Sequence, residues 1–242
     1  MTGVMQSMIN NVPQGIVTSG LVYYLDIGNT SSYSGSGSSV SDISGQGLGA
    51  STLFNSPTYT SAGTGSYLTF NGTNQYVFTS NLVSKFNSPS NPATTIEMWT
   101  YATSDNGGMV AENGSSTLDG GWYDTQMEID TGAMNMRMWN LSAVSAGSYN
   151  RSTWNQSVFT YDGTTFRTYL NNVAGQTTTG TRQTPWANGY NLYYGLMAPS
   201  ATNLGDGSYL AGRWSIFRVY NRALSASEVS INYNMNKGRY GL

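Results

Sequence analysis

The stretch GRWSIFRVYNRALSASEV, residues 212–229, decides the fold class that we expect for this chain. Residues 214–220 are aromatic or β-branched in large part, which favours a β-strand. Side chains alternate between the two faces of a strand, so one face of this strand should carry Trp214, Ile216, Arg218 and Tyr220. We therefore expect a strand late in the chain, near the point where the domain closes.

The residues after this strand are typical of a helix start. Ser225 and Glu228 have the spacing of a capping box, in which each side chain binds the backbone N–H of the other residue. Leu224 and Val229 have the spacing of a hydrophobic staple across the same turn. We expect a single helical turn within residues 226–232 that closes the domain after its last strand.

The rest of the chain predicts about a dozen strands at regular spacing. Two pairs look like hairpins: residues 67–78 around Asn71-Gly72, and residues 157–170 around Asp162-Gly163. The other strand candidates are residues 21–26, 95–101, 109–112, 125–130, 134–139 and 191–196. This pattern predicts an all-β fold, a two-sheet antiparallel jelly-roll sandwich with one short C-terminal helix.

Composition excludes several classes of function. The chain of 242 residues has 9% charged residues, 29 glycines, 18 tyrosines and a net charge of −2, which gives no basic surface for nucleic acid. It has no cysteine and no histidine, so disulfides and catalytic triads with histidine are ruled out. A polar surface with few charges suits neutral partners such as sugars or other protein shells.

We expect one domain at residues 20–242, preceded by an N-terminal arm at residues 1–19. The arm contains no Lys or Arg and no unbroken apolar run, so it does not resemble a signal peptide. No later segment is long and apolar enough to span a membrane. Residues 28–49 are rich in Ser and Gly, and we interpret them as a long surface loop of the domain rather than a linker.

Several motifs, in this order, resemble the concanavalin A-like (laminin-G-like, pentraxin-like) jelly-roll family. They are GLVYYLD (20–26), LTFNGTNQYV (68–77), TIEMW (95–99), WNQSVFTYDGT (154–164), FRTYLNN (166–172) and FRVYNRALS (217–225). The resemblance implies the sandwich fold, which serves lectins, adhesion modules, glycanases and virus coat proteins alike. The closing motif and the polar composition look like versions found in tailed-phage virion proteins.

Acidic residues gather in one segment that has no Lys or Arg of its own. It holds six of the 12 acids, at positions 105, 112, 119, 124, 128 and 130. Carboxylates that crowd together repel one another unless water or a cation screens them, and calcium takes oxygen ligands only. If calcium binds, the candidate ligands are Asp119, Asp124, Glu128 and Asp130; the alternative is that these acids are simply solvated.

Residues 126–130, QMEID, resemble the E-x-D-x-E strand of laminarinase-like glycoside hydrolases. Alternation places Gln126, Glu128 and Asp130 on one face. A retaining glycosidase needs two carboxyl groups beside the scissile bond. With Glu128 as the first acid the second position is Gly132, and with Gln126 as the first the nucleophile is an amide, so we expect no enzyme activity and no catalytic residue.

Sugar binding is the alternative function class. Sugars stack on aromatic rings, and the loops offer Trp122, Tyr123, Tyr149 and Trp186 for this purpose. Aromatic residues of a sandwich more often fill its core, and we assign Trp99, Trp139 and Trp214 to the core.

The sequence thus predicts a non-enzymatic phage virion protein, a jelly-roll module that decorates the capsid surface. Its expected partners are other virion proteins and copies of itself, with the N-terminal arm as the anchor. The second alternative is a carbohydrate-binding, lectin-like module on a tail or fibre that contacts host-surface glycans, with or without calcium. A glycoside hydrolase is the third. We expect no required cofactor and a location on the virion.

Overall fold

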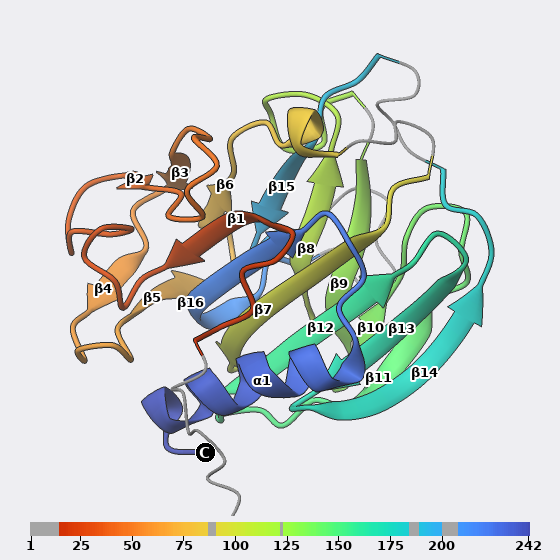
Figure 1. Cartoon of the computed structure of the whole chain (residues 1–242). Helices are drawn as coiled ribbons and strands as arrows, with labels where there is room; N and C mark the ends of the chain where they lie inside the picture. The colour runs from red at the N-terminus through yellow and green to blue at the C-terminus, as the bar shows by residue number, and fades with distance from the viewer. Residues whose placement is uncertain (1–14, 87–90, 122, 184–188, 200–207) are drawn as a thin grey trace, which may run out of the picture.

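The computed structural model describes residues 15–86, 91–121, 123–183, 189–199 and 208–242. Within these residues, two antiparallel sheets of eight strands each pack face to face (Figure 1). The α-helix α1 (Ala226–Lys237) lies across the outside of one sheet. This arrangement confirms the predicted two-sheet sandwich with a short C-terminal helix.

The sheet beneath the helix, sheet A, is built around the long strand predicted at the end of the chain. Its order is β14 (Val173–Thr179), β13 (Thr165–Leu170), β12 (Asn155–Tyr161), β7 (Thr94–Ala102), β16 (Ala211–Tyr220), β5 (Tyr67–Asn71) and β4 (Thr58–Thr60). β1 (Leu21–Asp26) also pairs with β16. β16 therefore contacts β1, β5 and β7, which makes it the centre of the sheet.

The opposite sheet, sheet B, contains the segment rich in acids. Its order is β11 (Val144–Ser148), β10 (Ala133–Met136), β9 (Tyr123–Asp130), β8 (Gly107–Asn113), β15 (Tyr193–Leu196), β6 (Tyr76–Phe78), β3 (Ser51–Phe54) and β2 (Ser39–Val40). Between the sheets lies the main core, where Tyr194 of β15 meets Phe217 of β16 edge to face at 5.8 Å between ring centroids. The loop that we predicted at residues 28–49 contributes Tyr33 and Val40 to this core.

A bulge in β16 changes which residues share a face. The pairing with β7 shifts between Trp214 and Ile216, so Ser215 is an extra residue. Trp214 consequently points into the core with Phe217 and Val219, while Arg218 and Tyr220 face the helix. The predicted shared face of Trp214, Ile216, Arg218 and Tyr220 is therefore wrong at Trp214.

The two predicted hairpins have different outcomes. β12 and β13 form the expected hairpin around Asp162-Gly163. β5 and β6, on either side of Asn71-Gly72, do not pair with each other, because β5 belongs to sheet A and β6 to sheet B. The Asn71 side chain accepts a hydrogen bond from the Thr73 amide at 2.9 Å and so shapes the crossing between the sheets.

The helix begins where we predicted but runs for three turns instead of one. Ser225 and Glu228 form the capping box, and the side chains of Asn232 and Asn236 are buried against sheet A. Asn232 donates to the Glu97 carboxylate at 2.7 Å, and Asn236 accepts from Arg218 at 3.2 Å. Because these buried residues are polar, the sequence shows no apolar stripe that would predict the added length.

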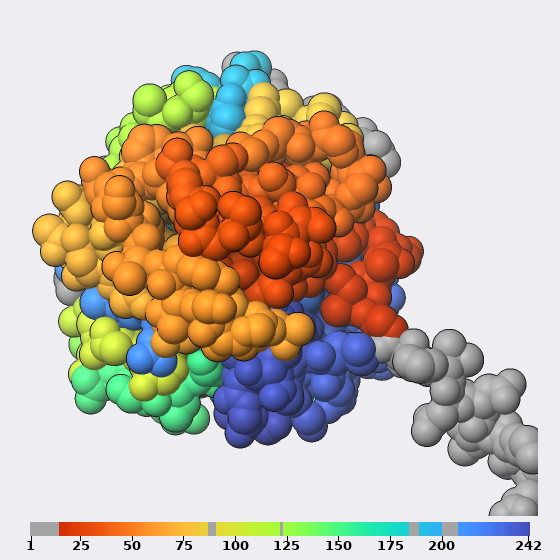
Figure 2. Space-filling view, turned by 90° about the vertical axis from the view of Figure 1, so that its left-hand side faces the viewer, coloured from red at the N-terminus to blue at the C-terminus, as the bar shows by residue number. Residues whose placement is uncertain are grey.

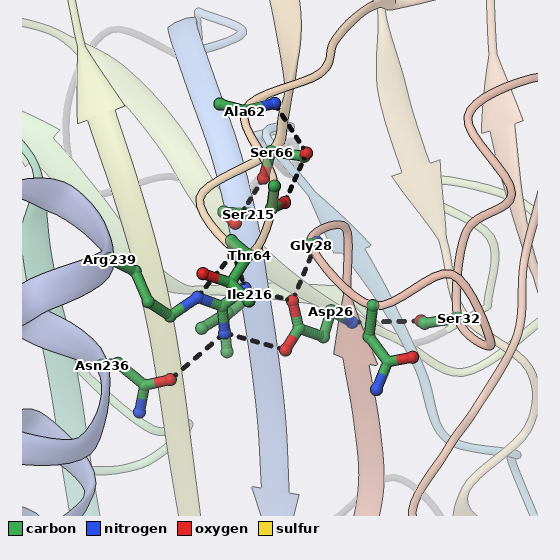
Figure 3. A network of polar contacts seen from close by, with 12 residues as sticks. Asp26, Gly28, Ser32, Ala62, Thr64, Ser66, Ser215, Ile216, Asn236 and Arg239 are labelled. Carbon is green, nitrogen blue, oxygen red and sulfur yellow. Dashed lines mark hydrogen bonds and ion pairs between the residues drawn. The ribbon is translucent and has the colours of Figure 1, made fainter.

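A second polar network fixes the end of the chain to β1 (Figure 3). Arg239, in the 3₁₀ turn η3 (Gly238–Tyr240), binds both carboxylate oxygens of Asp26, at 2.6 and 2.9 Å. It also donates to the Thr64 carbonyl at 2.6 Å. A side chain on Gly28 would place its Cβ 1.9 Å from that carbonyl oxygen, so this close approach requires glycine. Among the described residues, another 3₁₀ turn is η1 (Val83–Lys85).

The start of the chain joins the same side of the molecule. The Val17 amide donates to Asn232 at 2.9 Å, and the Tyr220 hydroxyl donates to the Val17 carbonyl at 3.1 Å. Most of the predicted arm, residues 1–14, lies outside the described residues. Figure 2 shows the neighbouring face, which residues of about 20–75 cover in red to orange, with the helix region in blue below.

Two further sequence predictions concern single elements. Trp139 was assigned to a core strand, but β10 ends at Met136, and Trp139 lies half-buried in a turn where its indole donates to Gln183 at 3.0 Å. None of the helices among the described residues is long and apolar enough to cross a membrane.

Removal of the helix cap gives a first testable prediction. Ser225→Ala should lower the free energy of unfolding by about 1 kcal/mol, because the Glu228 amide loses its acceptor at the helix start. Urea denaturation measures this, with Ser31→Ala in an exposed turn as the control. Equal stability of the two variants would show that the cap contributes nothing.

Candidate functional site

The outer surface of sheet B carries aromatic side chains from three neighbouring strands. In β6, Val77 lies in the core, so Tyr76 and Phe78 on either side of it point outward. In β3, Leu53 lies in the core and Phe54 points outward by the same alternation. The strand pairing places Phe54 directly opposite Tyr76. Alternation and pairing together therefore gather aromatic rings at one place on this surface.

The rings form two groups at close distances. Phe54 and Tyr76 stack almost parallel with centroids 4.4 Å apart, and Tyr209 lies 6.2 Å beyond Tyr76. Phe78 stacks on Tyr193 of β15 at 5.5 Å. Phe54 is 37% exposed even though Tyr76 covers one of its faces. We call these five residues the aromatic face; its row of three half-buried or exposed rings offers apolar surface to a ligand.

Polar groups border the aromatic face. The pKa of the Tyr209 phenol is raised mainly by burial and, to a smaller extent, by the negative charge of Asp119. The Asp119 amide donates to the Asn113 side chain at 2.8 Å, which anchors residues 114–121 across sheet B. Leu118 of the same loop covers Gly195, where an added Cβ would lie 2.8 Å from it. Burial also raises the pKa of Tyr76.

A groove lies on the far side of the turn that follows β3. It has a volume of about 520 Å³ and is lined by Tyr33, Gly35, Gly37, Ser38, Leu53, Ser56, Pro57 and Tyr59. The rings of Tyr33 and Tyr59 meet edge to face at 5.4 Å. Tyr33 is buried in the core and Tyr59 is half-buried, so Tyr59 supplies the aromatic surface of this groove.

Of the four residues predicted for sugar stacking, the structure describes Tyr123 and Tyr149. Tyr149 is 5% exposed, and its hydroxyl donates to the Thr100 carbonyl at 3.0 Å. Because the ring is buried, the prediction of an exposed ring there is wrong, and the same burial raises the pKa of Tyr149 to about 12. Tyr123 is half-buried at the start of β9. Trp122 and Trp186 lie outside the described residues.

Sequence reasoning missed the aromatic face because of a misplaced strand. We paired residues 67–70 with 75–78, which hid the fact that Tyr76 lies beside Phe54 in sheet B. The alternation of Leu53 and Val77 with their aromatic neighbours is the signal that would have pointed to an outward aromatic pair.

The predicted calcium ligands are spread over the sheet. The charge of Asp119 acts on Tyr209. Glu128 lies between the core residues Met127 and Ile129, so its side chain points away from the core, although it is buried. Asp130 is the last residue of β9. Asp124 forms an ion pair with Arg137. In the described part of the chain, no three acidic side chains converge in a way that could hold a metal ion. Calcium binding remains a prediction.

Arginines from other segments neutralise much of the acidic segment. Arg182 pairs with Glu112 at 3.0 Å, and both side chains are almost fully buried. Arg137 pairs with Asp124, and Arg151 with Asp105 on the surface. The absence of Lys and Arg within residues 105–130 therefore does not leave these three carboxylates without counter-charges.

The QMEID strand does not keep the alternation that we predicted for it. The β8–β9 pairing shifts so that Ala111 meets Thr125 while Val110 meets Met127, which leaves Gln126 as the extra residue of a bulge. Gln126 donates to the buried Glu112, on the interior side, whereas Glu128 points outward. Gln126 and Glu128 therefore do not share a face.

Solved structures share this fold at low sequence identity. Domain 4 of the arabinanase AbnA from Geobacillus stearothermophilus, in complex with arabinotriose, matches with 16% identity and a TM-score of 0.56; the alignment covers 88% of this chain and 97% of that one. Trypanosoma rangeli sialidase, as its covalent intermediate, matches with 16% identity and a TM-score of 0.61, covering 96% and 36%. The binding domain of botulinum neurotoxin DC with SialylT matches with 11% identity and a TM-score of 0.59, covering 90% and 52%.

These similarities concern the fold, and this chain spans about a third of the sialidase and about half of the neurotoxin binding domain. A comparison with curated proteins finds no match. The family model of the concanavalin A-like lectin/glucanases superfamily matches residues 70–230, which is well over half of the chain. The two-sheet fold of this chain agrees with the family match of its sequence. The chain therefore belongs to the concanavalin A-like lectin/glucanases superfamily.

Proposed function

We propose that this protein is a carbohydrate-binding module whose ligand lies on the aromatic face of sheet B. The observation that carries the proposal is the row of Phe54, Tyr76 and Tyr209, a partly exposed run of rings. The charge of Asp119 acts on Tyr209. Rings of this kind stack on the apolar faces of sugars, and the phenols and the carboxylate supply hydrogen bonds. Structures of the same fold with arabinotriose and with SialylT support a sugar ligand.

Loss of the central ring tests this proposal. We expect Tyr76→Ala to weaken binding to the best ligand of a glycan array by about 30-fold, because a central aromatic anchor contributes at least about 2 kcal/mol. Tyr76→Phe keeps the ring and should keep most of the affinity. Titration calorimetry with each purified variant measures both effects.

Two other results would redirect the assignment. If Tyr59→Ala removes binding and Tyr76→Ala does not, the sugar lies in the groove and the aromatic face is not the site. The same array with EDTA tests the calcium prediction: a metal-dependent site loses its signal, and a purely aromatic site keeps it.

We also propose that the module binds sugars without cleaving them. The buried acids near the QMEID strand already have partners: Glu112 pairs with Arg182, and Asp124 with Arg137. Glu128 points to the opposite side from Glu112, so these two do not form a pair across one sugar-binding cleft. We expect no turnover of β-glucans or of the best array ligand, measured by reducing-end release.

We further propose, from the closing motif and the composition, that the module is displayed on a phage particle as a surface protein that associates with itself. Val17, where the arm meets the domain, lies beside helix α1 on sheet A, whereas the aromatic face lies on the outside of sheet B. An arm that anchors the protein would thus leave the aromatic face outward. Deletion of residues 1–16 should abolish incorporation into particles, measured by mass spectrometry, and leave sugar binding intact.

A further inference from the structure

One arginine differs from all the others in this protein. The chain has eight arginines, and seven form ion pairs with carboxylates: Arg137, Arg151, Arg167, Arg182, Arg218, Arg222 and Arg239. Within the described residues, the guanidinium of the eighth, Arg213, forms no ion pair and no hydrogen bond. In a chain with more acids than bases, an arginine without a counter-charge calls for an explanation.

Arg213 lies on the outside of sheet A. It is next to Trp214, which points into the core, so its own side chain points away from the core. The guanidinium carbon lies 4.3 Å from the ring centroid of Tyr101 and 4.8 Å from that of Tyr67. Tyr101 is its partner across the β16–β7 pairing, and Tyr67 belongs to β5 on the other side. The guanidinium therefore lies over the rings of two tyrosines from the flanking strands.

The rings continue beyond the two tyrosines. Trp154 meets Tyr67 and Tyr101 edge to face at 5.8 and 6.0 Å, and it stacks on Tyr240 at 4.4 Å. All five residues are half-buried, so the group forms part of the surface. We call Arg213, Tyr67, Tyr101, Trp154 and Tyr240 the arginine platform.

The chemistry of the platform follows from its geometry. A guanidinium that contacts rings but makes no hydrogen bond keeps its N–H groups available, and a planar carboxylate binds such groups with two parallel hydrogen bonds. The flanking rings restrict the arginine before any ligand arrives, so less side-chain entropy is lost on binding. The adjacent aromatic surface suits the apolar face of a sugar ring. A single open arginine matches a single negative charge better than it matches a polyanion.

We propose that the arginine platform is a second binding site, specific for a sugar that carries a carboxylate group. The carboxylate binds the edge of Arg213 while the sugar ring rests against the neighbouring aromatic rings. This site lies on sheet A, on the opposite side of the sandwich from the aromatic face, so each site can exist without the other.

The experiment compares acidic sugars with neutral partners of the same shape. Galacturonic acid, which carries one carboxylate, is paired with its methyl ester, and 3′-sialyllactose with lactose; a sulfated lactose separates carboxylate recognition from binding of any anion. We expect the carboxylate form of at least one pair to bind about tenfold more tightly than its neutral partner, in line with a charge-assisted hydrogen-bond pair. Binding to ¹⁵N-labelled protein should shift the Arg213 Nε–H resonance.

Variants assign this preference to Arg213. Arg213→Gln should remove the advantage of the acid, so that the acid and its neutral partner bind with similar affinity, whereas Arg213→Lys should keep part of the advantage. Thermal denaturation confirms that each variant is folded. Equal affinity for acid and neutral sugar in both pairs overturns the proposal, as does an unchanged preference in Arg213→Gln. A preference for the sulfated sugar over the carboxylates overturns the carboxylate assignment.

The same measurements distinguish this site from the proposed function. Tyr76→Ala removes binding to the aromatic face. It should not change the preference of the arginine platform for the acidic sugar over its neutral partner. If Tyr76→Ala abolishes the acid preference and Arg213→Gln does not, the acidic sugar binds on sheet B and the platform is not a site.

Discussion

Replacing Glu97 with alanine is expected to destabilise the protein by about 3–5 kcal/mol, the usual cost of removing one partner of a buried ion pair. Glu97 is fully buried in β7. Its carboxylate accepts hydrogen bonds from Trp99, Gln156, Arg218 and Asn232, at 2.7 to 3.1 Å. Without it, Arg218 remains buried without its carboxylate partner, and helix α1 loses its contact through Asn232.

Urea denaturation measures this loss, and thermal unfolding should show a midpoint lower by about 10 °C. Asp105→Asn is the matched control, because its ion pair with Arg151 is half exposed and should contribute less than about 1 kcal/mol. The double variant Glu97→Leu with Arg218→Met should recover much of the stability, since the isolated charge is gone. A Glu97→Ala variant as stable as the control would show that this network does not hold the helix.

Acidification from pH 8 to pH 5 is expected to stabilise the protein, in contrast to most globular proteins. Burial raises the pKa of Asp124 to about 7. The charge of Arg137 works against this increase, and the charge of Glu112 adds to it. Burial also raises the pKa of Glu112. A raised folded-state pKa means that the folded protein keeps a proton which the unfolded chain has released. Stability is therefore highest on the acid side and falls as the pH rises from about 4 to about 7, by at most about 4 kcal/mol.

The chain suits this experiment because it has no histidine, so few other side chains titrate between pH 5 and pH 8. The carboxyl groups of Asp26, Asp162 and Glu228 have lowered pKa values, owing chiefly to arginine partners for the latter two, and lose their contribution only at lower pH. Asp124→Asn should remove most of the slope, measured by urea denaturation at several pH values. Asp162→Asn should leave the slope unchanged. A wild-type stability that rises from pH 5 to pH 8 contradicts the prediction.

Local signals in the sequence were sufficient for several elements. The capping box at Ser225 and Glu228 and the hairpin around Asp162-Gly163 involve residues close in sequence, and both formed as predicted. The order of the family motifs was sufficient for the fold class. The interactions that stabilise the cap and the hairpin join residues close in sequence, and the fold class follows from the alternation of core residues along each strand. Both features can therefore be predicted from neighbouring residues in the chain.

The candidate sites depend on contacts between distant segments. The aromatic face needs Phe54 beside Tyr76, which follows from the crossing at Asn71-Gly72 from one sheet to the other. The arginine platform needs β5, β7 and β16 side by side, and the bulge at Ser215 that sends Trp214 inward while Arg213 stays outside. Neither the sheet to which a strand belongs nor the position of a bulge is visible in a local pattern.

The sequence by itself determined the class of the protein: an all-β sandwich closed by a capped helix, without disulfides and without histidine chemistry. Tertiary structure alone decided how the buried charges are paired, since Arg182 reaches Glu112 and Arg218 reaches Glu97 from far along the chain. It also decided that Arg213 stays unpaired among the described residues and that Tyr149 is buried. The physical reason is that burial and charge pairing depend on the packing of two whole sheets, whereas turns and caps depend on a few consecutive residues.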